Sequence, residues 1–290
     1  MEIKTFAPRY LMVNFAFIRF IVAISLCALS MTAAMGQTKE EIVLLKTRNN
    51  IVLPYWLLQQ TTPVKVVAVL FTGGFGLLKL QTTDKGVAWS DTGTSYLVLN
   101  KDLFIDSETA VAIVDTPSDQ SVIGYVPKFR KSDDHSTDVR QIVKDLRIRF
   151  PQAKLFLVGT SQGATSAAYA GKALGKEIDG VVLTASVFDW APASWRMLSD
   201  SNLSDFDLSK ISAPLLIVHH VDDKCVATTY SGAEKKSAGK YPFISVRGGT
   251  PVQDNGCGPQ GPHGFLGREG PVATEIKNWM HGRPYKSDIQ

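Results

Sequence analysis

The chain has 290 residues, of which 44% are hydrophobic and 20% charged, and its formal net charge is +4. This is the composition of an ordinary globular protein, and the length suffices for one large domain. Because Lys and Arg are scattered rather than gathered into a stripe, the sequence argues against nucleic-acid binding. The one basic cluster, "KFRK" at 128–131, is interpreted as a solvated loop rather than a phosphate site.

Residues 1–36 have the pattern of a secretory signal peptide. Basic residues precede the apolar segment "FIVAISLCALSMTAAMG" at 20–36, which ends in small residues suited to cleavage after Ala34 or Gly36. The apolar run is short for a membrane span, which needs roughly 20 residues, but the stretch before it is also apolar and leaves an uncleaved anchor as an alternative. We expect an exported protein, periplasmic or secreted, with residues 37–290 as one catalytic domain and no stable membrane association after cleavage.

The rest of the chain alternates apolar, β-rich runs with helical patterns. An antiparallel pair of strands is expected over 42–60, with its turn at Asn49-Asn50, and amphipathic helices over 139–150 and 272–280. Strands that alternate with helices indicate an α/β domain with a mostly parallel sheet. Further strands are expected at 64–71, 110–114, 154–158, 180–184, 214–218 and 242–246.

Two stretches, 79–105 and 187–210, show no clear element, and each is a candidate for a small insertion over the functional site. Trp190 and Trp195 in the second stretch either wall an acyl pocket or serve as plain packing residues. His135, near the start of a predicted helix, is interpreted as an ordinary surface residue.

The segment "FLVGTSQGATSAAYAG" at 156–171 places a G-x-S-x-G pattern between a strand and a helix. This is the context of a nucleophile elbow, a sharp and strained turn that exposes a serine at the top of the sheet. Side chains at Gly159 or Gly163 would block the close packing of strand against helix. The helix is expected to stop at Gly175. Ser161 is therefore the predicted nucleophile.

Polar residues follow the later strands at the carboxyl edge, where α/β sheets place their sites. Asp222 and Asp223 follow the strand at 214–218, and His263 lies in the Gly- and Pro-rich loop after the next strand. The chain order of serine, acid and histidine is the order found in α/β-hydrolases. His263 is the predicted base and Asp223 its orienting acid. Asp189 is the alternative acid.

Four segments carry a resemblance to the α/β-hydrolase superfamily: "LFTGGFG" at 70–76, "GTSQG" at 159–163, "HHVDD" at 219–223 and "PHGF" at 262–265. In size and in the lack of a large cap domain, the chain resembles the dienelactone hydrolase-like branch. The acid of that family often lies in a pattern such as H-G-x-x-D, which places it at Asp223 when the pattern begins at His219.

The resemblance also has departures. His220 stands where the family commonly has Gly, Thr72 stands where many lipases and esterases have His, and dienelactone hydrolase itself uses a cysteine nucleophile in place of Ser161. His219 and His220 are interpreted as packing or supporting groups beside the acid.

The hydrolase mechanism also needs donors for the oxyanion that forms in the transition state. One is expected from the backbone N–H of Gln162, the residue after the nucleophile. The other is expected from the "TGGFG" loop, first from the N–H of Gly74 and next from Phe75. The alternative for the glycine pair is a tight turn that binds no ligand.

Cys27 lies in the predicted signal peptide, which leaves two cysteines in the exported chain, and two cysteines in an oxidising compartment most often pair. Cys225 and Cys257 are expected to form a disulfide; two unrelated buried thiols are the alternative. No cluster has metal-ligand spacing, and no G-x-G-x-x-G follows a strand. We therefore expect no metal or dinucleotide cofactor.

These residues predict a serine hydrolase that cleaves a small-molecule or polymeric carboxylic ester through an acyl-serine intermediate. A peptidase or amidase on the same fold is the first alternative, although a prolyl-oligopeptidase type would carry a propeller of several hundred residues. A non-catalytic binding protein on a hydrolase scaffold is the second. The combination of Ser161, Asp223, His263 and the glycine loop argues against that last reading.

Overall fold

A computed structural model describes residues 38–290 of the chain, apart from 61–62, 91–94, 190–199, 201 and 251–255. The predicted signal peptide lies outside the described residues, as do Trp190 and Trp195. Within the part that is described, we find no helix with the length and apolar character that a membrane crossing requires.

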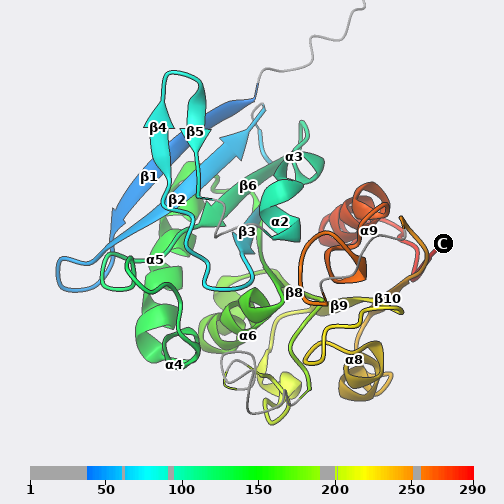
Figure 1. The fold of residues 1–290 in the computed structure, drawn as a ribbon. Coiled ribbons are helices and arrows are strands. Elements are labelled where there is room, and N and C mark those ends of the chain that lie inside the picture. Colours follow the sequence, from blue (N-terminus) through cyan, green and yellow to red (C-terminus); the bar gives the residue numbers. More distant parts are fainter. Residues whose placement is uncertain (1–37, 61–62, 91–94, 190–199, 201, 251–255) are drawn as a thin grey trace, which may run out of the picture. The chain divides into compact units, whose positions relative to one another are not determined.

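A mixed sheet forms the centre of the domain, and its nine described strands have the order β1-β2-β6-β3-β7-β8-β9-β10-β11 (Figure 1). Strand β2 is antiparallel to both β1 and β6, whereas all the other neighbours pair in parallel. This arrangement confirms the predicted α/β class and the antiparallel pair at its start. The strands are β1 Lys39–Lys46, β2 Val52–Gln59, β3 Val66–Phe71, β6 Thr109–Val114, β7 Lys154–Thr160, β8 Gly180–Thr184, β9 Leu215–His220, β10 Phe243–Val246 and β11 Asp288–Ile289.

Helices cover both faces of this sheet (Figure 1). Apolar residues of α5, α6 and α8 join one hydrophobic cluster, and those of α2, α3 and α9 join the cluster on the opposite face. Because both faces are covered, strands such as β3, β6 and β8 are buried along their whole length. The helices are α2 Tyr96–Leu99, α3 Lys101–Phe104, α4 Pro127–Arg130, α5 Asp133–Arg149, α6 Gln162–Leu174, α8 Tyr230–Ser237 and α9 Glu269–His281, with 3-10 turns η2 Gly175–Glu177, η4 Leu208–Lys210 and η5 Pro262–Gly264.

The longest helix, α5, follows from local sequence rules. Its apolar residues Val139, Ile142, Val143 and Leu146 recur at helical spacing and are all buried against the sheet. Its N-cap is Ser132, whose hydroxyl accepts a hydrogen bond from a backbone N–H of the first turn. The predicted helix is therefore present, and it begins before the apolar pattern does.

The predicted insertion at 79–105 forms a small hairpin of β4 (Gln81–Thr83) and β5 (Gly86–Ala88), followed by α2 and α3. Residues at the start of α2 reach the functional cavity described below. This placement agrees with the expectation of an insertion near the site.

Two surface predictions are wrong. His135 is fully buried, with its ring packed against those of Phe71, Tyr125 and Phe129. The "KFRK" segment belongs largely to helix α4, and its Arg130 is also fully buried. Charge and polarity suggested exposure, but part of the environment is distant in the sequence: Phe71 packs on His135, and the carbonyl groups of Thr72 and Gly74 accept hydrogen bonds from Arg130.

Candidate active site

Ser161 occupies a strained turn between β7 and α6. Its φ of 53° and ψ of −124° lie in a region that residues with a side chain seldom adopt. A Cβ on Gly159 would collide with the carbonyl of Gly163, and one on Gly163 with the carbonyl of Phe71. The two glycines are therefore required by close backbone packing. The local geometry is that of the predicted elbow.

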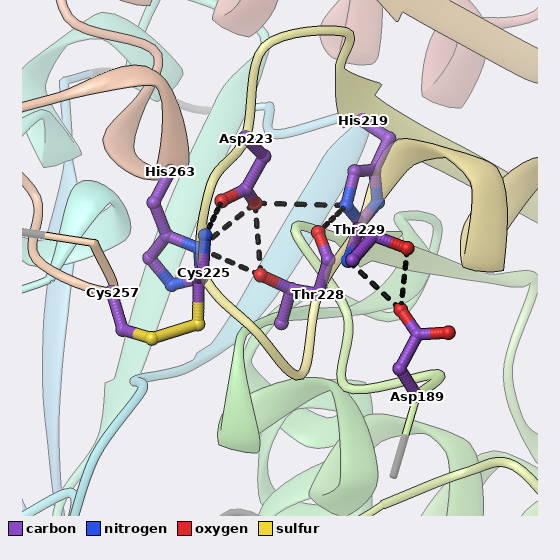
Figure 2. The surroundings of a disulfide bond; sticks show 8 residues. All are labelled: Asp189, His219, Asp223, Cys225, Thr228, Thr229, Cys257 and His263. Carbon is purple, nitrogen blue, oxygen red and sulfur yellow. Dashed lines mark hydrogen bonds and ion pairs between the residues drawn. A yellow bond between two sulfur atoms is a disulfide. The ribbon is translucent and has the colours of Figure 1, made fainter. Parts of the chain in front are cut away.

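Asp223 and His263 lie together at the carboxyl edge of the sheet, in the loops that follow β9 and β10 (Figure 2). The Nδ1 atom of His263 lies 3.0 Å from Oδ2 of Asp223, and both residues are buried. A proton on Nδ1 donates to the carboxylate and leaves the lone pair on Nε2 available to accept another proton. The pair can therefore act as an oriented base.

Thr228 is a third member of this cluster that the sequence reasoning missed (Figure 2). Its hydroxyl donates to Oδ2 of Asp223 at 2.9 Å and lies 3.1 Å from Nδ1 of His263. Because one oxygen atom touches both groups, Thr228 restrains the carboxylate and the imidazole relative to each other. The only local signal was a hydroxyl residue five positions after the predicted acid.

The environment of Asp223 favours its ionised form. Burial by itself would raise the pKa of the carboxyl group, but the charge and hydrogen bond of His263 outweigh it, with help from His219 and the backbone N–H of Cys225. The pKa is lowered as a result. Asp223 therefore remains a carboxylate across the neutral range and can stabilise an imidazolium.

His219 lies on the other side of the carboxylate. Its Nε2 donates to the carbonyl oxygen of Thr228 and is 3.6 Å from Oδ2 of Asp223. Burial lowers the pKa of His219, although Asp223 and the carbonyl act against this. A neutral, fully buried ring suits the predicted supporting role rather than that of the base.

The other two acids lie elsewhere. Asp222 is exposed to solvent. The carboxylate of Asp189 accepts hydrogen bonds from the backbone N–H of Thr229 at 2.9 Å and from its hydroxyl at 2.7 Å (Figure 2). Asp189 therefore supports the N-cap of α8, and among the three candidates Asp223 is the one that contacts His263.

Ser161 and His263 line the same small cavity, of about 120 Å³. Gly73, Gly74 and Thr160 form part of its wall, and Ser95, Tyr96, Cys257, Pro259 and Gly264 complete the lining. The hydroxyl of Ser95 is buried and has no hydrogen-bond partner among the described residues. Neither Ser95 nor Tyr96 was predicted as a site residue, because residues 95–96 carry no recognisable motif.

Of the residues predicted to supply oxyanion donors, Gly74 lines this cavity, and Phe75 and Gln162 each follow a lining residue in the chain. Gly74 lines it and has a φ of 55°, a conformation that favours glycine. Gln162 is the first residue of α6, where backbone N–H groups have no partner within the helix. Phe75 has a side chain that is 45% exposed. A developing negative charge near Ser161 would thus lie between a glycine turn and a helix N-terminus.

Cys225 and Cys257 form the predicted disulfide, and Cys257 lies on the cavity wall. The bond joins the loop of Asp223 to the loop of His263, as Figure 2 shows. Among the described residues, no group of three or more His, Cys, Asp or Glu side chains could hold a metal ion.

A family model described as serine aminopeptidase, S33, matches residues 118–205, a segment that includes Ser161. No curated protein sequence matches the chain significantly.

Several solved structures share the fold. Est1E from Butyrivibrio proteoclasticus has a TM-score of 0.55 at 12% identity, covering 83% of this chain and 98% of its own. Dienelactone hydrolase from Anabaena variabilis has a TM-score of 0.53 at 10% identity, covering 85% and 99%. The acylaminoacyl peptidase of Pyrococcus horikoshii has a TM-score of 0.57 at 10% identity, covering 89% of this chain but 43% of its own. At such identities the likeness concerns the fold, which is that of the α/β-hydrolases, and no separate cap domain is seen among the described residues.

Proposed function

We propose that this chain, an α/β-hydrolase by fold, is an exported serine hydrolase that cleaves carboxylic esters through an acyl-Ser161 intermediate. The observation that carries the proposal is that Ser161, in its strained turn, lines the same cavity as His263, and that Asp223 holds Nδ1 of this histidine. Nucleophile, base and orienting acid are the three roles that acyl transfer requires.

In the first half of the reaction, Nε2 of His263 takes the hydroxyl proton while Oγ of Ser161 attacks the ester carbonyl carbon. Asp223 stabilises the imidazolium that results, and N–H groups of Gly74 and Gln162 stabilise the oxyanion. The C–O bond to the alcohol then breaks, and the alcohol leaves with the proton from His263. The acyl group remains on Ser161.

In the second half, a water molecule takes the place of the alcohol. His263 removes a proton from the water as its oxygen attacks the acyl carbon, and the same oxyanion donors stabilise the second tetrahedral intermediate. The bond to Oγ breaks, Ser161 regains its proton from His263, and the carboxylic acid is released. No cofactor takes part in this proposal.

An ester substrate is supported by the extent of the likenesses. The chain covers nearly all of Est1E and of the dienelactone hydrolase, but less than half of the acylaminoacyl peptidase. Amide cleavage is the second candidate, because the matching family model is described as a serine aminopeptidase. Both use the same residues, so only the leaving group distinguishes them.

A fluorophosphonate probe tests the enzyme class. We expect wild-type protein to be labelled at Ser161 and Ser161→Ala to be folded but unlabelled, with ester turnover lower by roughly 10⁴- to 10⁶-fold. Turnover above a few per cent of wild type in Ser161→Ala would show that the nucleophile is another group. An unlabelled, inactive wild-type protein would favour the binding-protein alternative.

A substrate panel separates the two enzyme candidates. Short acyl p-nitrophenyl esters and aminoacyl p-nitroanilides present similar chromophores with different leaving groups, and we expect kcat/KM to favour the esters after correction for their intrinsic reactivity.

The mass of the protein recovered outside the cytoplasm tests the export proposal, which predicts cleavage after Ala34 or Gly36.

A further inference from the structure

Arg130, the last residue of α4, is a buried cation close to the proposed oxyanion hole. Its Nη1 donates to the hydroxyl of Ser166 at 2.7 Å, and its Nη2 donates to the carbonyl oxygens of Gly74 at 2.8 Å and Thr72 at 3.5 Å. The guanidinium carbon lies 4.8 Å from the centre of the Tyr125 ring. Among the described residues, no carboxylate forms an ion pair with Arg130.

A buried charge without a counter-ion is costly to the folded state. Burial lowers the pKa of Arg130 to about 10, so the group remains charged at neutral pH. Carbonyl dipoles and an aromatic face provide partial compensation. Nε of the same guanidinium has no hydrogen-bond partner in the part of the chain that the structure describes. An arginine at the surface, paired with a carboxylate, would avoid this cost. The buried position of Arg130 therefore calls for a function that offsets the cost.

The three hydrogen bonds of Arg130 connect the two elements that carry the predicted oxyanion donors. Thr72 and Gly74 belong to the glycine loop after β3, whereas Ser166 lies on α6, one turn after Gln162. Helix α4 itself packs against α6 (Figure 1). One planar guanidinium group therefore contacts both sides of the proposed hole.

The bonds to the loop also orient its peptide groups. In a trans peptide the C=O and N–H point in opposite directions. Arg130 holds the carbonyls of Thr72 and Gly74, and the carbonyl of Gly73 between them accepts from the N–H of Gly76 at 3.2 Å. Arg130 thus restrains the peptide planes that contain the N–H groups of Gly73 and Phe75, and the bond from Gly76 restrains the plane between them, which contains the N–H of Gly74.

We propose that Arg130 is a positioning residue for the oxyanion hole, which holds the 72–76 loop and the start of α6 at a fixed separation and places a positive charge behind the loop. The inference rests on the proposed serine hydrolase activity. It differs from that proposal because Arg130 is not expected to touch the substrate. Its effect should appear in transition-state stabilisation rather than in substrate binding.

Steady-state kinetics with a short p-nitrophenyl ester test this role. We expect Arg130→Met to lower kcat by about 10- to 100-fold, since small displacements of catalytic groups and loss of oxyanion donors have effects of this order, while KM changes by less than about 3-fold. Arg130→Lys keeps the charge but loses the planar fork, and should recover part of kcat. Affinity for a trifluoromethyl ketone, which forms an oxyanion adduct with the serine, should fall in parallel with kcat/KM.

Arg140→Met is the matched control. Arg140 lies on α5 and donates to the carbonyl of Ala173 at 2.8 Å, at the far end of α6, and to Glu177 at 2.8 Å. It should alter thermal stability without altering kcat. A folded Arg130→Met with wild-type kcat, or a loss confined to KM, would overturn the proposal.

Ser166→Ala covers the case in which Arg130→Met does not fold. It removes only the acceptor on α6, and we expect kcat to fall by about 3- to 10-fold with KM nearly unchanged, the effect of losing one hydrogen bond. Wild-type kcat in a folded Ser166→Ala would then reject the link between α6 and the loop. Failure of the wild-type protein to label with fluorophosphonate would instead reject the serine hydrolase activity itself, so the two failures are distinguishable.

Discussion

Asp223 and Arg130 are both buried charges near Ser161, but the protein compensates for them in different ways. The Asp223 carboxylate has a hydrogen-bonded histidine, a threonine hydroxyl and a backbone N–H, and its loop is tied by a disulfide. Arg130 has two carbonyl oxygens, one hydroxyl and an aromatic face. The acid side, Asp223 with His263 and Thr228, therefore contains a histidine that can carry the opposite charge, whereas the groups that contact Arg130 on the arginine side are uncharged.

The histidines of the two regions show the same contrast. His263 is held at Nδ1 by Asp223, but both ring nitrogens of His135, beside Arg130, are buried and find no hydrogen-bond partner among the residues described. The pKa of His135 is lowered to about 3, first by burial and further by the positive charges of Arg130 and Arg48. One histidine is thus arranged to exchange protons, while the other is kept neutral as a packing group.

Neutralising Asp223, on the acid side of this contrast, should have the largest effect on activity. Asp223→Asn is expected to lower kcat by about 10⁴-fold, because an amide neither stabilises the imidazolium nor enforces the Nδ1–H tautomer. Steady-state ester hydrolysis measures the effect. Asp222→Asn should be close to wild type, since that side chain is exposed. A large loss in Asp189→Asn with little loss in Asp223→Asn would transfer the role of the acid to Asp189.

Removing the disulfide should weaken the acid side alone. Cys225 and Cys257 are 32 residues apart, so the double change Cys225→Ser/Cys257→Ser is expected to cost about 3–4 kcal/mol of stability on the chain-entropy model and to lower Tm by about 10 °C. Well below that Tm, kcat should still fall by about 10-fold, because the loop of His263 is less well placed. Calorimetry measures Tm, and ester hydrolysis at room temperature measures kcat. Unchanged kcat would show that the His263 loop keeps its position without the disulfide. Detection of two free thiols by mass spectrometry would show that the disulfide does not form.

His135 should make the arginine side sensitive to acid. Its pKa in the folded protein is about 3, below the value near 6.5 of an unfolded chain. The unfolded state therefore binds the proton first, and stability is lost as the pH falls from about 6.5 towards 3, by about 3 kcal/mol at pH 4. His135→Phe should remove this part of the loss between pH 7 and pH 4, as urea unfolding at the two values would show.

His281→Gln is the control for that measurement. Burial lowers the pKa of His281 as well, but its ring is only partly buried and lies 2.9 Å from the hydroxyl of Thr109. Its substitution should change the pH dependence less than His135→Phe does. If the free energy of unfolding had the same pH dependence in His135→Phe and the wild type, the proposal that His135 stays neutral in the folded protein would be wrong.

Thr228 provides the most local test of the acid side. Thr228→Val keeps the shape but removes the hydroxyl that touches Asp223 and His263, and we expect kcat to fall by about 10-fold, the value of roughly one hydrogen bond. KM should change little, and Thr228→Ser should restore most of kcat. Equal activity in the Val and Ser variants at wild-type level would show that Asp223 and His263 do not need the hydroxyl.

Local patterns were sufficient for the fold and for the position of the elbow. The alternation of apolar runs with helical periodicity predicted the α/β sheet, since burial on both faces leaves continuous apolar strands. The G-x-S-x-G pattern predicted a strained turn at Ser161, because only glycine fits where Gly159 and Gly163 meet the neighbouring backbone. The pairing of Cys225 with Cys257 was predicted from the two cysteines that remain after the predicted signal peptide.

What the sequence alone determined was the set of chemical groups and the edge of the sheet on which they lie, because strand direction and chain order bring loop residues to that edge. Only the tertiary structure decided which atoms touch. The sequence left Asp189 as an alternative to Asp223, and the structure shows that Asp223 contacts His263 while Asp189 contacts Thr229. Likewise, the sequence did not reveal that Arg130 is buried, because its hydrogen-bond partners lie from 36 to 58 residues away in the chain. Contacts of that range depend on how the strands and helices pack, which local propensity does not encode.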